Sequence, residues 1–182
     1  MAIKKIHTNK DAALQNKNKE VDFNDPELKE NIINLLDTLR VLPGYGLAAP
    51  QIGLNQKILV VENSEKIDDE GNITSEALPL TILINPVITK YSNEICDFEE
   101  GCFSVPFYRG NVTRPKKIKI SGFDEKGKKI KINASGLYSR VLQHEIDHLD
   151  GILFIDRIKD KSLLIPNVPD EAWKELLVNE KE

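Results

Sequence analysis

The sequence predicts an α+β fold, with mostly antiparallel sheets packed around a central helix and with flanking N- and C-terminal helices. Three observations support this prediction. Strand-like segments gather in the middle of the chain, two of them form a clear hairpin, and helical periodicity lies on either side. The 182 residues, of which 40% are apolar and 30% charged, are typical of a globular protein. At this length we expect one domain that spans residues 1–182.

The first predicted helix begins at Asp25 and Pro26, because aspartate is a good N-cap and proline suits the first helical position. Leucine and isoleucine then recur at helical spacing as far as Arg40, and a Pro-Gly pair follows. The small, glycine-flanked residues of 44–51 favour a loop or an extended edge strand.

The middle of the chain has the features of strands. Residues 57–62 are a buried type of strand, whereas the acidic and polar residues 63–79 indicate a surface loop. Residues 81–88 are rich in β-branched side chains, and Pro86 predicts a break within that strand. Alternating lysine and isoleucine in 116–132, on both sides of a turn, predict a hairpin with buried isoleucines and exposed lysines.

Two more helices are predicted after the hairpin. One occupies about 136–150, with Ser135 placed to cap its start and Gly151 to end it. The other is an amphipathic helix at about 169–179, which begins with a proline followed by acidic residues. The first of these two is the expected central helix.

Composition excludes several classes of protein. A net charge of −4 does not favour a nucleic-acid-binding protein, and we expect no direct sequence-specific contact with nucleic acid. No apolar run approaches the roughly 18 residues of a membrane helix, and the first residues lack the apolar region of a secretion signal. We therefore expect a cytoplasmic protein without a membrane partner. Two cysteines form no disulfide framework, so the soft metal ligands available are His7, Cys96, Cys102, His144 and His148.

The segment 143–148 contains the pattern H-E-x-x-H on the predicted central helix. His144 and His148 are four residues apart, so both imidazoles lie on one helix face and can bind one cation. Glu145 can then act as a general base on a water molecule. The alternative is an ordinary solvated helix face.

A catalytic metal site needs a third protein ligand. Phe154 occupies the position at which one class of zinc peptidase has a third histidine, so that class is excluded. Glu171 and Glu175 lie at a spacing that other H-E-x-x-H peptidases use. Cys102, in the glycine-flanked turn 100–104, offers a thiolate, which is a softer ligand than a carboxylate.

Three segments, 44–51, 100–104 and 143–148, together resemble the signature motifs of the peptide deformylase family in their order and spacing. The resemblance extends from about residue 25 to 160. It implies an enzyme that removes the N-formyl group from the initiator methionine of nascent polypeptides and releases formate. The alternatives are an H-E-x-x-H metallopeptidase and a catalytically silent homologue that keeps the metal.

The resemblance also implies the metal and the catalytic groups. The metal ligands would be Cys102, His144 and His148, and the expected ion is Fe²⁺, with Zn²⁺, Ni²⁺ or Co²⁺ able to replace it. Glu145 would transfer the proton of the attacking water to the leaving amine. The resemblance further implies that the side-chain amide of Gln51 and the backbone N–H of Phe103 would stabilise the oxyanion.

Further residues are expected to contact the substrate. Those near the motifs are Gly44, Tyr45, Gly46, Gly101, Arg109, Arg140 and Val141. Tyr45, Phe103 and Arg140 depart from the usual family pattern, which has an apolar residue near the last of these. We expect the Arg140 side chain either to extend to solvent, which is favoured because burying an unpaired charge is costly, or to narrow the methionine pocket.

Three expectations concern partners and supporting residues. The macromolecular partners would be N-formyl-methionyl nascent peptides, with a transient contact to the ribosome. Glu100 is expected to accept a hydrogen bond from a ligand imidazole, with Arg114 orienting Glu100. We expect His7 to be solvated and Cys96 to be a small buried strand residue, so neither takes part in the site.

Overall fold

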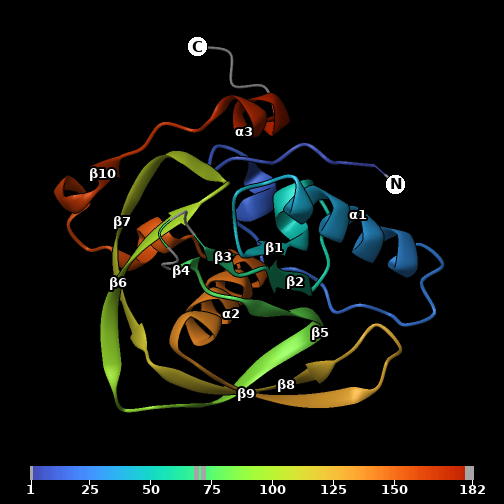
Figure 1. The fold of residues 1–182 in the computed structure, drawn as a ribbon. Coiled ribbons are helices and arrows are strands. Elements are labelled where there is room, and N and C mark those ends of the chain that lie inside the picture. Colours follow the sequence, from blue (N-terminus) through green and yellow to red (C-terminus); the bar gives the residue numbers. More distant parts are fainter. Residues whose placement is uncertain (1, 68–69, 71–72, 179–182) are drawn as a thin grey trace.

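The computed structural model describes residues 2–67, 70 and 73–178, and it contains two main antiparallel sheets (Figure 1). The larger sheet has the strand order β1-β2-β5-β8-β9, the smaller has the order β10-β7-β6, and β3 pairs with β4. The strands are β1 (Gly46–Ala48), β2 (Ile58–Asn63), β3 (Lys66–Ile67), β4 (Ile73–Ser75), β5 (Leu78–Tyr91), β6 (Ile95–Cys102), β7 (Val105–Pro115), β8 (Lys117–Phe123), β9 (Lys129–Ser135) and β10 (Ile165–Pro166).

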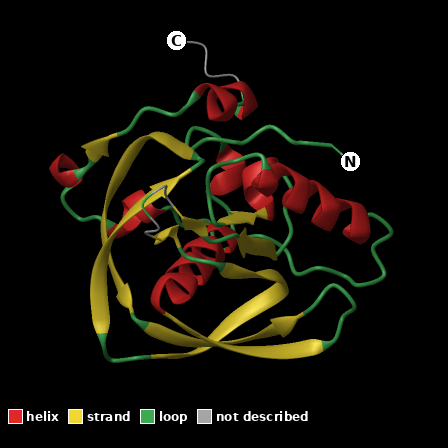
Figure 2. Ribbon diagram, in the orientation of Figure 1, coloured by secondary structure: helices red, strands yellow, loops and turns green. Residues whose placement is uncertain are grey.

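The central helix lies between these sheets, as Figure 2 shows. The α-helices are α1 (Leu28–Arg40), α2 (Gly136–Leu149) and α3 (Glu171–Leu176), and short 3₁₀ turns occupy Ala12–Leu14, Ala49–Ile52, Phe154–Arg157 and Lys161–Leu163. The predicted α+β class is therefore confirmed, and α2 is the helix that carries H-E-x-x-H.

Helices α1 and α2 pack on opposite faces of the larger sheet. Alternate residues of β2 serve the two faces: Val60 packs in the cluster that contains Leu35 of α1, and Leu59 packs in the cluster that contains Leu142 of α2. All four side chains are fully buried. Burial of each such side chain contributes roughly 1.5–3 kcal/mol, so α2 is held firmly beneath the sheet.

The ends of the helices differ slightly from expectation. Helix α1 begins at Leu28, because Asp25 forms a turn in which its carboxylate accepts a hydrogen bond from the Glu27 N–H at 2.9 Å. Ser135 occupies the N-cap position of α2, but its side chain makes no capping hydrogen bond. Gly151 follows α2 with a φ of 74°, a conformation that favours glycine.

Strand β5 continues past the predicted break. Its pairing with β8 shifts register between Ile84 and Val87, so Pro86 lies in a bulge. Asn85 has a φ of 49°, and its side-chain oxygen accepts a hydrogen bond from the Val21 N–H at 2.8 Å. This bulge ties the N-terminal segment to the sheet.

Two predicted segments need correction. The region predicted as a surface loop, 63–79, contains the short strands β3 and β4, while residues 68, 69, 71 and 72 lie outside the described residues. The C-terminal helix is shorter than 169–179, because Leu177 leaves the helix to form a parallel bridge with Ile6. Residue 179, the last of that prediction, lies outside the described residues.

Where the chain is described, none of its helices is long and apolar enough to cross a bilayer.

Candidate metal centre

Strand β6 and helix α2 bring together the three predicted metal-binding residues. The ligand atoms of Cys102, His144 and His148 all lie within 4.8 Å of one another. The Cys102 Sγ is 3.2 Å from the His148 Nε2, and the two imidazole rings have centroids 5.0 Å apart. Cys102 ends β6 directly after a register shift, so the strand bends where the thiol meets the helix.

Glu100 orients the imidazole of His144 through the ring nitrogen that is not the proposed metal ligand. The His144 Nδ1 lies 2.9 Å from the Glu100 Oε2, which leaves Nε2 as the ligand atom. Arg114 of β7 donates to both oxygens of this carboxylate, from Nε at 2.6 Å and from Nη2 at 2.9 Å. The expected relay from Arg114 through Glu100 to the imidazole is therefore confirmed.

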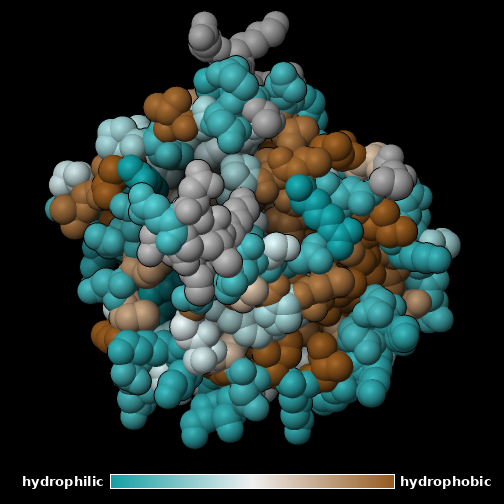
Figure 3. Space-filling model, in the orientation of Figure 1, coloured by the Kyte–Doolittle hydropathy of each residue, from teal (hydrophilic) through white to brown (hydrophobic). Residues whose placement is uncertain are grey.

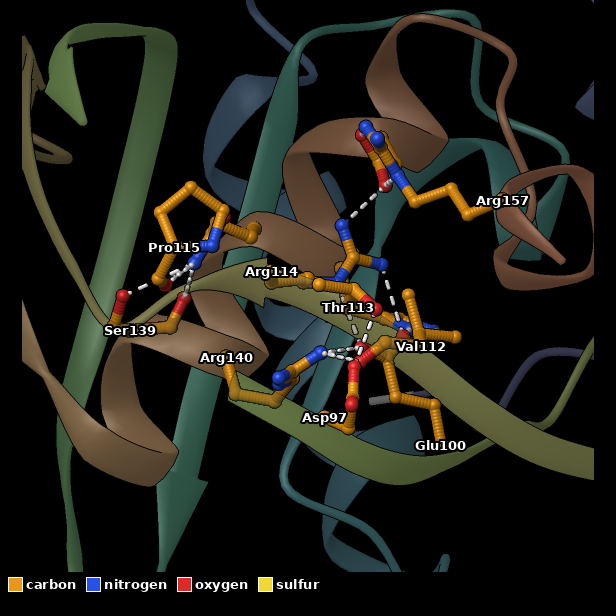
Figure 4. A network of polar contacts seen from close by, with 12 residues as sticks. Asp97, Glu100, Val112, Thr113, Arg114, Pro115, Ser139, Arg140 and Arg157 are labelled. Carbon is orange, nitrogen blue, oxygen red and sulfur yellow. Dashed lines mark hydrogen bonds and ion pairs between the residues drawn. The ribbon is translucent and has the colours of Figure 1, made fainter. Parts of the chain in front are cut away.

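The same arginine extends this polar network through the interior (Figure 4). The Arg114 Nη1 donates to Asp147 at 2.6 Å, and Arg157 binds the other side of that carboxylate. Asp147 belongs to α2, between the two histidines of the motif. The helix, β7 and the turn after α2 are thus joined by paired charges.

The favoured prediction for Arg140, that its side chain extends to solvent, is wrong, although Arg140 does line the cleft. Its side chain is only 7% exposed, and its guanidinium points inward (Figure 4). The Arg140 Nη1 donates to Glu100 Oε1 and to the Val112 carbonyl, both at 2.8 Å, and Nη2 donates to the Cys96 carbonyl at 2.8 Å. These acceptors compensate the buried charge, so it has no need of solvent.

Burial and charge control the protonation of the site. Burial alone would raise the pKa of Glu100, but hydrogen bonds from Arg114 and His144 outweigh it and hold this pKa well below its usual range. Burial lowers the pKa of His148 well below its ordinary value. That imidazole is therefore neutral, which is the state that binds a metal.

Glu145 lies beside these groups without a fixed partner. Its side chain is buried, and Oε2 is a buried oxygen to which the described residues donate no hydrogen bond. Burial raises the pKa of Glu145 to about 7. A carboxyl group of this kind can accept and return a proton near neutral pH.

Gln51 has a defined orientation at the centre. Its Oε1 accepts a hydrogen bond from the Ala48 N–H at 2.8 Å. The Nε2 therefore faces the other way, 3.3 Å from the Ser104 Oγ and 3.7 Å from the Cys102 Sγ. The amide presents its hydrogen-bond donors to the region beside the thiol.

Protein side chains lie so close to Gly44 and Gly46 that neither position has room for a Cβ atom, whether or not a ligand is bound. A Cβ atom on Gly46 would lie 2.8 Å from the Glu145 Oε1, and one on Gly44 would lie 2.2 Å from the Phe103 ring. Gly101 is different, because an added Cβ would meet only ordinary contacts. Gly46, which begins β1, and Gly44, two residues before it, therefore let the carboxylate and the ring approach this segment.

One cleft, bounded by the β1 segment, β6 and α2, contains almost all the predicted residues. His148 lies behind the cleft and is buried. Arg109 lies at the cleft with its side chain 47% exposed and pairs with Glu99 at 3.2 Å. The predicted residues that line the cleft are Gly44, Tyr45, Gly46, Gln51, Gly101, Cys102, Phe103, Arg109, Arg140, Val141, His144 and Glu145.

Sequence reasoning missed one wall of this cleft, which the C-terminal segment supplies through Asn167 and Trp173. The Trp173 indole packs edge-to-face on Phe103, with centroids 5.5 Å apart, and its N–H donates to the Phe103 carbonyl at 3.2 Å. A lone tryptophan on an amphipathic helix was the only available signal, and it did not indicate which surface it would meet.

The remaining candidate ligands lie elsewhere. The Glu171 side chain is 85% exposed and pairs with Lys174, so the alternative third ligand gains no support. Cys96 and Cys102 are both free, and Cys96 is half-buried. His7 is also half-buried rather than fully solvated, with its Nδ1 3.3 Å from the Asp11 carboxylate. The thiol and two imidazoles beside an unpartnered buried carboxylate oxygen fit a divalent metal ion.

Comparison with known proteins decides the family. A model of the polypeptide deformylase family matches residues 3–163. The chain belongs to the polypeptide deformylase family.

Relatives share most of the chain. It is 42% identical to a peptide deformylase of Picosynechococcus, over 87% of this chain and 81% of that protein. It is 44% identical to one of Natranaerobius thermophilus, over 88% and 95% of the two chains. Among solved structures, Arabidopsis thaliana peptide deformylase 1B matches with a TM-score of 0.75 and 38% identity over 86% of this chain and 82% of that one. A Met-Ala-Ser-bound class I type b peptide deformylase of Acinetobacter baumannii matches with a TM-score of 0.77 and 28% identity, over 86% and 100%.

Membership establishes the activity. The enzyme is a metal-dependent hydrolase that removes the N-formyl group from nascent polypeptides. The predicted function is thereby confirmed.

Proposed function

We propose that Cys102, His144 and His148 hold the metal ion of this deformylase. The observation that carries the proposal is the convergence of their ligand atoms within 4.8 Å. We propose Fe²⁺ as the native ion, with Zn²⁺, Ni²⁺ or Co²⁺ as substitutes in purified protein. When bound, such an ion acts as a Lewis acid that polarises the formyl carbonyl and makes water acidic enough to react near neutral pH.

We propose that Glu145 moves the proton. It accepts the proton of the attacking water and delivers it to the amine of the leaving peptide. Three observations support this role: the carboxyl group is buried at the cleft, its Oε2 is uncommitted, and its pKa is raised by burial to about 7. Gly46 supports it by leaving the carboxylate room to lie against β1.

We propose that the Gln51 Nε2 and the backbone N–H of Phe103 stabilise the developing oxyanion. The Ala48 N–H holds the Gln51 amide with its donors directed toward the thiol, so no reorganisation is needed during the reaction. Phe103 directly follows the ligand Cys102 and is held between Gly44 and Trp173.

We propose that the substrate lies extended in the cleft between β1 and β6, each of which is the last strand of its sheet. Such strands have free backbone groups that can pair with a peptide. The methionine side chain would occupy the apolar part beside Tyr45 and Val141, together with the aliphatic stem of Arg140. Gly44, Gly46 and Gly101 would border the peptide backbone, and Arg109 would lie along its downstream part.

We propose that the enzyme works in the cytoplasm. Its substrates are nascent polypeptides, so a transient contact with the ribosome is part of the proposal. The free thiol of Cys102 supports a reducing compartment, because a ligand thiolate must not be oxidised.

The test is formate release from formyl-Met-Ala-Ser by anaerobically purified protein. We expect wild-type turnover and a decrease of about 10²–10⁴-fold in Glu145→Ala, with metal content unchanged. Metal-loaded wild-type protein that releases no formate would contradict the function. A fully active Glu145→Ala variant would contradict only the role of Glu145.

A second variant tests the oxyanion site. Gln51→Ala should lower turnover by about 10²–10³-fold while the metal is retained. Ser104→Ala is the matched control, because Ser104 contacts the same amide at 3.3 Å but has no proposed role in the reaction. Equal turnover in Gln51→Ala and wild type would remove Gln51 from this role.

A further inference from the structure

The larger sheet carries a concentration of positive charge far from the chemistry of the cleft. Five exposed lysines project from β5, β8 and β9, and we call this set the lysine face. In the described part of the chain, none of them takes part in an ion pair. The lysine face consists of Lys90, Lys117, Lys119, Lys129 and Lys131.

Strand register places these like charges next to one another. Lys90 lies directly opposite Lys119, and Lys131 is diagonal to Lys119 across the β8–β9 pair. Directly opposite residues in antiparallel strands have Cβ atoms about 5 Å apart, where like charges destabilise the sheet. The residues between the lysines on this face include Ser121 and Asn133, which do not neutralise them.

The nearest acidic residues do not offset the lysine face. Glu94 is bound by Lys116 at 2.7 Å. Asp124 accepts hydrogen bonds from the backbone N–H groups of Lys126 and Lys128 in the β8–β9 turn. The turn carries two acidic and two basic side chains and is neutral by itself. In a chain with a net charge of −4, the excess positive charge is therefore local.

The lysines also border a hollow. Lys90, Lys117 and Lys119 line it together with Tyr91 and with the polar groups of Asn133 and Ser135. Figure 3 shows hydrophilic side chains along the lower edge of the molecule, where Figure 1 places β8 and β9. Hydroxyl and amide groups among lysines are the donors that proteins use to contact phosphate and sugar.

We propose that the lysine face binds the phosphate backbone of RNA without reading its sequence. A polyanion relieves the repulsion between the neighbouring lysines and releases its own counterions. A bilayer is a less suitable occupant, because its surface is flat whereas the lysine face borders a hollow. The hollow and its interleaved polar donors instead match a chain of phosphates.

Binding at the lysine face is separable from catalysis. Ile118 and Ile120 alternate with its lysines along β8 and are buried in the cluster that contains α2. The lysines therefore lie on the opposite face of the sheet from the helix that carries His144 and His148. Removing lysine charge should leave formyl-peptide hydrolysis unchanged.

The probe is a fluorescent oligouridylate of about 16 nucleotides, measured by anisotropy against the full-length enzyme. The variant Lys90→Gln/Lys119→Gln/Lys131→Gln removes three charges from the lysine face. Its matched control, Lys17→Gln/Lys29→Gln/Lys159→Gln, removes three charges from exposed lysines on other elements. At about 0.7 released counterions per phosphate contact, the first variant should bind roughly 100-fold more weakly near 0.1 M salt.

The control variant should bind within about twofold of wild type, and the salt dependence should become shallower only in the first variant. Both variants should hydrolyse formyl-Met-Ala-Ser at the wild-type rate, which shows that they are folded and separates this result from the proposed function. Equal weakening in the two variants would overturn the proposal, as would absent RNA binding by wild type. Lysine-dependent binding to phosphatidylglycerol vesicles in place of RNA would also overturn it.

Discussion

The network around Glu100 and the lysine face both concentrate charged side chains. Among the described residues, the charges are paired in the network and have no ion pair on the lysine face. In the network, Glu100 is bound by Arg114 and Arg140, and Asp147 by Arg114 and Arg157. On the lysine face, five positive charges stand in neighbouring register positions without an ion pair among the described residues.

Burial explains the difference. A charge inside the protein loses its hydration, so it is tolerated only with partners in good geometry. Those partners also fix the position of the groups they hold, and here they orient His144. Exposed lysines keep their hydration, so their mutual repulsion costs little and they remain free for a ligand. Paired charge therefore positions a catalytic group, whereas unpaired charge is available to a partner.

The largest expected effect comes from breaking the paired region. Arg114→Met removes the side chain that joins Glu100 to Asp147 and leaves both carboxylates partly uncompensated. We expect a loss of about 3–5 kcal/mol in the free energy of unfolding, measured by urea denaturation. Arg109→Met, at an exposed ion pair, should change it by less than about 1 kcal/mol. Similar losses in the two variants would contradict the importance of burial.

A smaller effect is expected at Arg140, because Arg114 still holds Glu100 when Arg140 is lost. Arg140→Met keeps an apolar stem in the cleft but leaves the carbonyls of Cys96 and Val112 without this donor. We expect a loss of about 1–3 kcal/mol by the same measurement, with partial recovery in Arg140→Lys. Arg157→Met should cost less, since that side chain is 40% exposed. The reverse order would show that exposure does not control these energies.

The smallest expected effect is an increase in the free energy of unfolding, caused by a charge reversal on the lysine face. Lys119→Glu places a carboxylate opposite Lys90 and beside Lys131. We expect the free energy of unfolding to rise by about 0.2–1 kcal/mol, measured by thermal unfolding at low salt. The gain should shrink at high salt, where exposed charges are screened. A destabilised variant would show that the lysines do not repel one another in the folded protein.

Much of the fold could be predicted because its signals are local. The alternation of lysine and isoleucine correctly predicted the β8–β9 hairpin, and helical periodicity with a glycine stop correctly predicted α2. The end of α3 could not be predicted, because it depends on pairing between Leu177 and Ile6 at opposite ends of the chain. Periodicity contains no information about such a contact.

The candidate site could likewise be predicted where its signals are local, but not where it depends on contacts between distant parts of the chain. The spacing of His144 and His148 was sufficient to predict that these two ligands converge, whereas the resemblance to the deformylase motifs was needed to choose Cys102 as the third. The orientation of Arg140 could not be deduced, because besides Glu100 its acceptors are the backbone carbonyl oxygens of Cys96 and Val112. Backbone acceptors have no signature in a sequence. The sequence therefore could not show that a buried Arg140 would find hydrogen-bond partners.

Trp173 gives the protein a built-in optical reporter. It is the single tryptophan of the chain, and its indole lines the cleft against Phe103. All indole emission therefore originates at the wall of the cleft, without a background from other sites. A shift or quenching of that emission would follow a peptide entering the cleft in real time, even in an inactive variant that turns nothing over.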